Sequence, residues 1–466
     1  MRYVSTRGEA PALPFDEVLL TGLARDGGLY VPETFPRFAK AELEGLKGLP
    51  YADLAVRVMA PFLGDALAKA DFASLVHKAY AGFDDPDIAP LRQMGPDAWL
   101  LELFHGPTLA FKDYALQVVG RLFDHVLTAR KSRITVLGAT SGDTGSAAIE
   151  ACRDRDAIDI FILHPKGRVS EVQRRQMTTV TASNVHNLAI EGTFDDCQDL
   201  VKGMFNDAAY RDALKLSSVN SINWARILVQ TVYYFHAVLA LGAPEKGITF
   251  AVPTGNFGNV YAGYVAKQMG LPISRLVIGT NRNDILYRFF TTGEMTMRAV
   301  EPSLSPAMDI QISSNFERYL FDLYGRDGAR LAKAMADFRR DGHLEVEKPL
   351  LEQALETFLP HRLDDEATLQ TIAAVYRENG FLVDPHTAVA IAAARYAEAD
   401  GPVVTLASAH PAKFPDAVEK ATGVRPSLPA HLADLFEREE RMTTLPNDLA
   451  AVEAHIQARA NPGGAP

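Results

Sequence analysis

The sequence predicts an α/β protein with two open, mostly parallel sheets, each flanked by helices and joined at a cleft. Short β-branched runs alternate with amphipathic segments from about residue 100 onward. Such alternation is typical of parallel strands connected by crossover helices that cover both faces of a sheet. The chain has 466 residues, which is enough material for more than one sheet.

Six runs have the length of a buried strand, and most are followed by a helical pattern. They are Arg133–Leu137, Ile158–Leu163, His186–Ile190, Ile248–Val252, Arg275–Ile278 and Val403–Leu406. The region before residue 95 has a different texture, with helix-like stretches at Phe15–Ala24 and Tyr51–Phe62. Three prolines near residues 86 to 96 suggest a boundary there, and the tail after Arg425 is expected to be helical and polar.

The amino-acid composition indicates which classes of protein and which partners are compatible with the sequence. Hydrophobic residues make up 47% of the chain and charged residues 23%, the balance of an ordinary globular protein. The formal net charge of −11 disfavours nucleic acid and anionic membranes as partners. Two cysteines without C-x-x-C spacing, and no apolar leader or long apolar stretch, predict a cytoplasmic location.

Three strand-to-loop junctions carry unusual chemistry, and in open α/β sheets ligands bind beyond the carboxyl ends of strands. Residues 137–146 read L-G-A-T-S-G-D-T-G-S, and residues 251–259 read A-V-P-T-G-N-F-G-N. Their small residues would let backbone N–H groups approach a carboxylate or a phosphate at a helix N-terminus. An ordinary capped turn remains the alternative for either loop, and neither has the spacing of a P-loop or a dinucleotide loop.

The third junction, residues 406–414, places Ser408 at the end of the last strand. From spacing alone, a serine that merely satisfies the strand end is the simpler interpretation. Lys112 is another candidate, because it follows the mostly apolar segment Thr108–Phe111. A lysine in a partly apolar site loses its proton readily and can attack a carbonyl group, although most lysines are solvated surface charges.

Five motifs in order resemble the threonine synthase family, more closely its longer bacterial and fungal branch. They are F-H-G-P-T-L-A-F-K-D, A-T-S-G-D-T-G, N-S-I-N-W-A-R, P-T-G-N-F-G-N and A-H-P-A-K-F. The segment Gly28–Pro32 also resembles the "G-L-x-x-P" of that branch. The match extends from the first residues to about Phe414, so it covers most of the chain.

The resemblance implies a pyridoxal-phosphate (PLP) enzyme of fold type II, with the active site in the cleft between the two sheets. Lys112 matches the lysine that carries PLP covalently, and Ser408 the hydroxyl facing the pyridine nitrogen. Asp143 occupies a position beside the cofactor's 3′-oxygen that is often Asn in related enzymes. The loop that cups the cofactor phosphate is matched by Gly255, Asn256, Phe257, Gly258 and Asn259.

The substrate contacts follow from the same resemblance. Ser141, Gly142 and Thr144 would receive the substrate's carboxylate or phosphate. Asn220, Ser221 and Arg226 resemble the group that grips the substrate phosphate, for which the fork of an arginine is suited. Taken alone, Arg226 would be interpreted as a surface salt bridge.

The implied reaction converts O-phospho-L-homoserine and water into L-threonine and phosphate. We expect an N-terminal extension domain (1–95), a large PLP-binding domain (96–113 and 236–466) and a small α/β domain (114–235). The sequence does not distinguish a monomer from a homodimer.

The sequence disfavours four alternatives to this interpretation. A serine/threonine dehydratase or a β-replacing synthase of the same fold needs no phosphate grip, and a non-catalytic relative needs no Lys112. A nicotinamide oxidoreductase lacks support in the loop spacing. No histidine cluster suggests a metal, so no metal site is expected.

Overall fold

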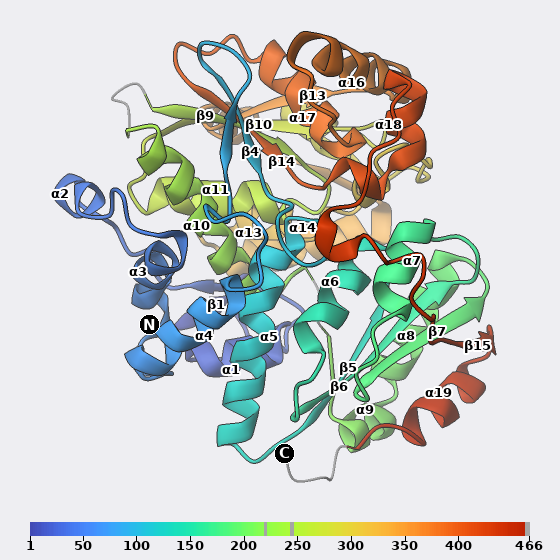
Figure 1. The fold of residues 1–466 in the computed structure, drawn as a ribbon. Helices are drawn as coiled ribbons and strands as arrows, with labels where there is room; N and C mark the ends of the chain where they lie inside the picture. The colour runs from blue at the N-terminus through green and yellow to red at the C-terminus, as the bar shows by residue number, and fades with distance from the viewer. Residues whose placement is uncertain (219–220, 243–246, 462–466) are drawn as a thin grey trace. The chain divides into compact units, whose positions relative to one another are not determined.

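The computed structural model describes residues 1–218, 221–242 and 247–461, and the chain divides into two compact units. Unit 1 consists of residues 1–105 and 221–426, and unit 2 of residues 106–220 and 427–466. Each unit contains one large sheet with helices packed on it (Figure 1). The predicted fold class is therefore confirmed.

The sheet of unit 1 has six strands in the order β13-β10-β9-β14-β4-β3, all parallel except β3. Its strands are β3 (Leu91–Gln93), β4 (Ala98–Glu102), β9 (Ile248–Pro253), β10 (Ile273–Thr280), β13 (Phe358–Arg362) and β14 (Val403–Ala407). Because β4, β9 and β14 are parallel neighbours, the loops that follow them emerge at the same edge of the sheet.

Helices pack on the sheet of unit 1. Helix α17 contacts β9, β10 and β14, and Ala251, Val277 and Ala393 form a small buried cluster there. In α11, a Cβ atom on Gly263 would lie 2.8 Å from Tyr234 and 2.9 Å from Leu276, so this helix is closely packed between α10 and β10. The helices here are α10 (Trp224–Ala240), α11 (Gly258–Gln268), α12 (Ile285–Thr292), α13 (Phe316–Leu323), α14 (Gly328–Asp341), α15 (Lys348–Leu355), α16 (Asp365–Asn379), α17 (Pro385–Tyr396) and α18 (Pro415–Thr422), with the small hairpin β11 (Glu294–Thr296) and β12 (His343–Glu345).

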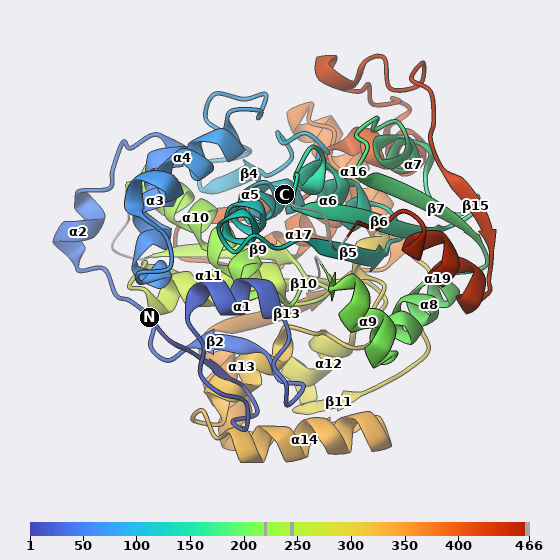
Figure 2. The same cartoon turned by 90° about the horizontal axis from the view of Figure 1, so that it is seen from below.

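The N-terminal region packs against the same unit. Helices α1 and α3 both contact α10, and the short strands β1 and β2 pair antiparallel (Figure 2). Tyr3 lies 5.9 Å from Trp224 between ring centroids, and both side chains are fully buried. The elements are β1 (Tyr3–Ser5), α1 (Phe15–Thr21), β2 (Tyr30–Pro32), α2 (Lys40–Glu44), α3 (Tyr51–Leu63) and α4 (Lys69–Tyr80).

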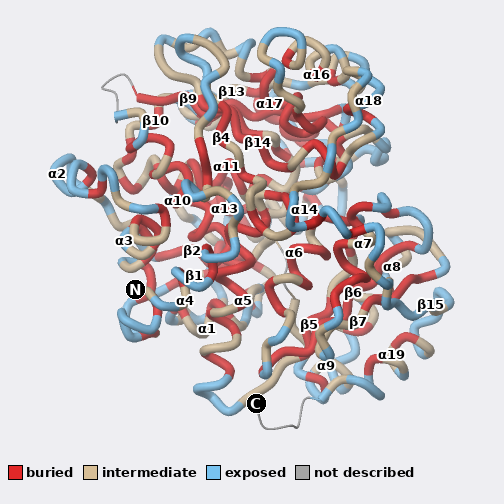
Figure 3. Tube along the Cα trace, in the orientation of Figure 1, coloured by how far each residue is buried: buried red, intermediate tan, exposed pale blue. Residues whose placement is uncertain are grey.

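Unit 2 has a five-stranded parallel sheet in the order β15-β7-β6-β5-β8. Residues of β5, β6 and β7 form a buried cluster with residues of α8 and α19, and buried residues follow these strands in Figure 3. The elements are α5 (Lys112–Ala129), β5 (Ile134–Ala139), α6 (Asp143–Cys152), β6 (Ile158–Pro165), α7 (Glu171–Thr178), β7 (Val185–Glu191), α8 (Phe194–Asn206), α9 (Ala208–Leu214), β8 (Leu216–Ser217), β15 (Thr443–Pro446) and α19 (Leu449–Gln457).

All six runs expected to be strands are strands, and the two N-terminal helical stretches are α1 and α3. The compact units differ from the expected domains. No division falls near residue 95, because β3 pairs with β4 inside the sheet of unit 1. The changes of unit lie at residues 105/106 and 220/221 rather than 113/114 and 235/236.

The C-terminal tail also differs from expectation. Residues 427–466 belong to unit 2, whereas the sequence analysis assigned them to the large domain. The tail was expected to be helical, but it contributes strand β15, which pairs with β7, before α19. Across the described parts of the chain, no helix is both long and apolar enough to span a membrane.

The contact between α5 and α6 gives a test of the packing of unit 2. A Cβ atom on Gly120 would lie 2.4 Å from the carbonyl oxygen of Ala151, so Gly120→Ala should force the helices apart. We expect it to lower the free energy of unfolding by about 1–3 kcal/mol, measured by chemical denaturation. The matched control is Gly82→Ala, where a Cβ atom would have no neighbour within 4 Å. Equal stability of the two variants would contradict this packing.

Candidate active site

The loop between β9 and α11 in unit 1 is built for close backbone approach. A Cβ atom on Gly255 would lie 3.0 Å from the carbonyl oxygen of Ala307, and one on Gly258 would lie 3.3 Å from Nδ2 of Asn315. Phe257 adopts a left-handed conformation with φ of 63° and is buried against Phe316 and Phe358. Its aromatic anchorage offsets the backbone strain, which costs on the order of 1–3 kcal/mol.

The segment 313–315 orients this loop by binding its carbonyl groups. Ser313 Oγ donates to the carbonyl oxygen of Gly255 at 2.8 Å, and the Asn315 amide N and Nδ2 donate to that of Asn256 at 3.0 and 3.1 Å. Within the described residues, the N–H groups of Asn256, Phe257 and Gly258 donate to no protein acceptor. The carbonyl groups are therefore satisfied while several donors at a helix N-terminus remain for an anion.

Two buried side chains add donors without acceptors. Oδ1 of Asn259 accepts from Tyr233 at 2.6 Å and from Tyr234 at 3.0 Å, while its Nδ2 has no partner in the described part of the chain. Arg226, near the start of α10, is 4% exposed, and its Nε and Nη1 also lack partners there. Burial lowers the pKa of Arg226 to about 10, so the guanidinium stays charged at neutral pH. A buried cation without an ionic partner is energetically unfavourable, and an anionic ligand would neutralise it.

Ser221 lies beside the loop, since its carbonyl oxygen accepts from Asn315 Nδ2 at 3.1 Å and its Oγ is 3.3 Å from Ser314 Oγ. Ser314 Oγ in turn donates to Asn256 Oδ1 at 3.3 Å. Asn220, predicted to act with Ser221, lies outside the described residues.

Ser408 follows β14 at the same sheet edge as the loop after β9, as expected, and is 6% exposed. A network of buried hydrogen bonds supports the residues at this edge of the sheet. Asp384 accepts from the Thr387 hydroxyl and from His386 Nδ1 at 2.7 Å. Thr387 Oγ1 accepts from the backbone N–H of Ser408 at 3.3 Å, and His386 Nε2 accepts from the N–H of Ala307 at 3.2 Å. Asp384 thus supports both Ser408 and the segment that touches Gly255.

Arg318 connects the N-terminal region to the loop. Its side chain is fully buried and donates to the carbonyl oxygens of Tyr30 and Ile222 and to Oδ1 of Asn315. Burial lowers the pKa of Arg318 to about 10, while the electrostatic effects of Tyr261 and Glu317 favour its charged form. The neighbouring Glu317 accepts from Thr6 Oγ1 at 2.8 Å and from the Arg7 guanidinium at 2.9 Å twice, a bidentate pair.

In unit 2, Lys112 begins α5 and is 8% exposed. Its Nζ donates to Asp143 Oδ2 at 3.4 Å, and Asp143 Oδ1 accepts from Gln173 Nε2 at 2.8 Å. The turn before Lys112 is held by Asp113, which accepts from the Thr108 N–H at 2.8 Å and the Thr108 hydroxyl at 2.6 Å. This arrangement fixes the lysine stem and places a carboxylate beside its amine.

The loop from β5 to α6 also needs its glycines. Gly142 has φ of 147°, and a Cβ atom there would lie 2.4 Å from the Gln173 side chain. Thr140 Oγ1 accepts from the N–H groups of Gly142 at 3.0 Å and Gly145 at 2.9 Å. Ser141 is exposed at the tip of this loop and Thr144 is half-buried in the first turn of α6, so both hydroxyls remain near its surface.

Comparison with known proteins places the chain in a family. Its N-terminal residues 2–80 match the model "Threonine synthase N terminus", residues 88–340 match "Pyridoxal-phosphate dependent enzyme", and residues 387–456 match "Threonine synthase, C-terminal". A threonine synthase of Pseudomonas aeruginosa is 57% identical over 99% of each chain. One of Schizosaccharomyces pombe is 42% identical over 90% of this chain and 89% of the relative. The chain belongs to the threonine synthase family.

Solved structures of the family agree. PLP-bound threonine synthase from Brucella melitensis superposes with a TM-score of 0.97 at 52% identity, covering 99% of this chain and 100% of that one. Threonine synthase from yeast gives a TM-score of 0.94 at 39% identity, with 98% of both chains covered. The predicted resemblance and the predicted cofactor are therefore confirmed.

The residues present fit the cofactor of this family. The loop 255–259 offers unpaired backbone donors and the unpaired Asn259 amide, a donor set suited to a phosphate dianion. Lys112 offers a buried primary amine for covalent attachment. The predicted residues Gly255 to Asn259, Ser221, Arg226 and Ser408 lie in unit 1, whereas Lys112, Asp143 and the 141–144 loop lie in unit 2.

Several supporting residues were not found from the sequence. Ser313, Asn315, Arg318, Gln173 and Asp384 are ordinary polar residues in segments without a motif. The bonds of Ser313 to Gly255, Asn315 to Asn256, Arg318 to Tyr30 and Gln173 to Asp143 join residues 30 to 288 positions apart. Asp384 alone carried a local signal, since Asp before Pro-His-Thr is a typical N-cap.

Asn315 gives a test of the loop. Asn315→Ala removes donors to Asn256 and Ser221 and leaves both carbonyl oxygens without that bond, a loss of about 1–3 kcal/mol. We expect PLP to bind about ten-fold more weakly or worse, measured by titrating the apoenzyme and following the visible band. Asn206→Ala, at an exposed helix end in unit 2, is the control. Unchanged PLP affinity in Asn315→Ala would contradict the role of the 313–315 segment.

Proposed function

We propose that the chain is a threonine synthase that converts O-phospho-L-homoserine and water into L-threonine and phosphate, in the cytoplasm and with PLP as cofactor. The observation that supports it most is the match of both threonine-synthase-specific regions, residues 2–80 and 387–456, on either side of the PLP-dependent region. The rival dehydratases and β-replacing synthases need no phosphate grip. The buried, unneutralised Arg226 favours a substrate that carries phosphate.

PLP, when bound, supplies an electron sink that stabilises negative charge at the substrate's Cα. The chain supplies the remaining chemistry. Lys112 holds the cofactor between turnovers, and its freed amine removes the Cα proton as general base. A second proton leaves Cβ, phosphate leaves Cγ, and Cγ receives a proton; water then adds its oxygen to Cβ, and Cα is reprotonated. One amine within reach of these carbons would serve several of the transfers.

The other roles follow from local chemistry. The N–H groups of residues 255–259 bind the cofactor phosphate, and Ser408 offers a neutral hydroxyl to the pyridine nitrogen. Asp143, predicted beside the cofactor's 3′-oxygen, contacts Lys112 at 3.4 Å, which supports a role in orienting the amine. Gln173 fixes the other carboxylate oxygen of Asp143, so it acts through Asp143 as a positioning residue.

The substrate's anionic groups are assigned to two regions. Ser141, Gly142 and Thr144, at the start of α6, receive the carboxylate, where the helix dipole favours negative charge. Ser221 and Arg226, with Asn220, bind the phosphate. The oligomeric state is left open between a monomer and a homodimer.

Lys112→Ala tests the reaction. We expect kcat to fall by about 10³-fold or more, because both the covalent attachment and the base are lost. Phosphate and threonine release from O-phosphohomoserine should be stoichiometric in the wild type, with the visible cofactor band lost in the variant. Lys333→Ala, which removes an 81% exposed lysine, is the control. A cofactor band without threonine would move the substrate to one of the rivals.

Arg226→Lys tests the phosphate grip. Lysine keeps the charge but loses the planar fork, so KM for O-phosphohomoserine should rise by about 10- to 100-fold. PLP affinity, measured separately, should change little. Arg339→Lys, at an exposed position on α14, is the matched control. A loss of PLP affinity with KM unaltered would instead place Arg226 at the cofactor phosphate.

A further inference from the structure

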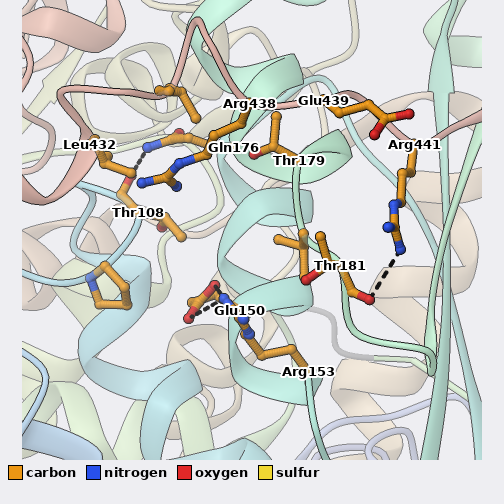
Figure 4. Close-up of a pocket in the computed structure, with 13 residues that line it drawn as sticks. Thr108, Glu150, Arg153, Gln176, Thr179, Thr181, Leu432, Arg438, Glu439 and Arg441 are labelled. Carbon is orange, nitrogen blue, oxygen red and sulfur yellow. Dashed lines mark hydrogen bonds and ion pairs between the residues drawn. The ribbon is translucent and has the colours of Figure 1, made fainter.

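A cavity of about 440 Å³ lies in unit 2, and among the residues given a role above Thr108, in the turn before Lys112, lines it (Figure 4). Its walls come from the turn before Lys112, from α6, from the end of α7 and the residues after it, and from the C-terminal segment 432–441. The size falls within the range of small-molecule sites in proteins.

Gln176, at the end of α7, lines this cavity and carries a buried acceptor. The side chain is 6% exposed, and its Nε2 donates to the carbonyl oxygen of Thr108 at 3.1 Å. Because that carbonyl can only accept, the orientation of the amide is fixed. Its Oε1 is buried and finds no donor anywhere in the described ranges. An unmet buried acceptor costs about 1–3 kcal/mol, which a ligand N–H donor would recover.

A guanidinium faces the same end of the cavity. Figure 4 shows Arg438 and Gln176 pointing toward the end formed by Thr108 and Leu432. Arg438 uses Nε and Nη2 for Asp434 and the carbonyl oxygen of His431. Its Nη1 makes no hydrogen bond to the described residues and is available for a carboxylate.

The charges elsewhere in the cavity are already paired or balanced. Glu150 and Arg153 form an ion pair at 3.2 Å. Arg441 and Glu439 are of opposite sign, so the lining does not present the excess of positive charge that a phosphate dianion requires. A zwitterion fits this balance better than a dianion.

The cavity also has an apolar part. Pro107, Leu432 and Leu435 line the cavity, and Leu432 and Leu435 pack in a buried cluster with Leu109. We propose that this cavity binds an aliphatic α-amino acid, with its carboxylate on Arg438, its ammonium group on Gln176 Oε1, and its side chain against Leu432 and Leu435.

The site is coupled to the catalytic lysine through one chain of contacts. Gln176 holds the Thr108 carbonyl, Thr108 binds Asp113 through its N–H and hydroxyl, and Asp113 directly follows Lys112. A ligand that fixes Gln176 therefore acts on the turn that positions Lys112. This coupling rests on the proposed function, whereas binding itself does not.

Calorimetry on the PLP-loaded enzyme tests binding with three matched probes: L-leucine, 4-methylpentanoate and 3-methylbutylamine. L-Leucine should bind, and loss of either its ammonium or its carboxylate group should weaken binding about ten-fold or more. No binding over the whole solubility range of L-leucine would overturn the proposal. Equal binding of all three probes would also overturn the proposal, because the two polar contacts would then contribute nothing to the affinity.

Two variants locate the bound probe. Arg438→Gln and Gln176→Met should each weaken L-leucine binding about ten-fold or more, while Arg459→Gln, an exposed arginine on the same tail, should not. L-Leucine bound equally well by both variants would place it elsewhere, including the active site, and would overturn the assignment. Two variants are used so that poor folding of one leaves the test intact.

Activity tests the coupling. Saturating L-leucine should change KM or kcat for O-phosphohomoserine about five-fold or more, and Gln176→Met should abolish that effect. Unchanged kinetics with L-leucine bound would overturn the coupling. Calorimetry needs no turnover, so a chain that makes no threonine but binds L-leucine would refute the proposed function and leave the binding site standing.

Discussion

The loop between β9 and α11, the candidate anion-binding loop of unit 1, depends on one buried cation, Arg318. Its guanidinium lies out of contact with solvent and donates to Tyr30, Ile222 and Asn315, which belong to three segments far apart in the sequence. Five donors in a rigid plane suit this task, because each segment contributes an oxygen and no counter-ion is needed between them. Since Asn315 in turn binds the carbonyl groups of Asn256 and Ser221, the loop keeps its shape only while Arg318 holds its three partners.

This dependence explains why the N-terminal region belongs to unit 1 instead of forming a separate body. Tyr30 lies on β2, and Thr6 and Arg7 bind Glu317, the residue beside Arg318. Asn223 also donates to the carbonyl oxygen of Leu19 at 2.8 Å. Residues before 32 therefore reach the segments on either side of the anion-binding loop. The region matched by the threonine synthase N-terminal model thus contributes directly to the support of the site.

In unit 2, a buried anion, Asp113, stabilises the turn that carries Lys112. Asp113 closes the turn through Thr108, and Leu109 adopts a left-handed conformation with φ of 63°. That conformation costs on the order of 1–3 kcal/mol for a non-glycine residue. Burial of the Leu109 side chain against Val172, Leu432 and Leu435 offsets the strain. The C-terminal tail is consequently part of the support for the turn before Lys112, although it lies more than 300 residues away in sequence.

The sequence revealed those parts of the fold whose signal is local. The runs that became β5, β6, β7, β9, β10 and β14 are mostly apolar and mostly buried, so the local sequence pattern identifies them as strands. Strand β15 was not predicted, because its residues Thr443–Pro446 are mostly exposed and lack apolar alternation. It is a strand because it pairs with the edge of β7. The boundary expected near residue 95 does not coincide with a division between the compact units, since prolines near there interrupt the local pattern but not the pairing of β3 with β4.

The features of the candidate site also fall into two groups, those that the local sequence indicates and those that only the tertiary structure shows. Residue type and position in the chain made Lys112, the glycines of both loops and Ser408 candidates, because these set reactivity, backbone freedom and the edge of the sheet, and the family resemblance gave them their expected roles. The tertiary structure decided the contact of Lys112 with Asp143 and the hydrogen bond of Gln173 to that carboxylate. It also left Nε and Nη1 of Arg226 without a partner among the described residues. A hydrogen bond or an unmet donor depends on which distant side chains burial brings together, and no local pattern in the sequence records that.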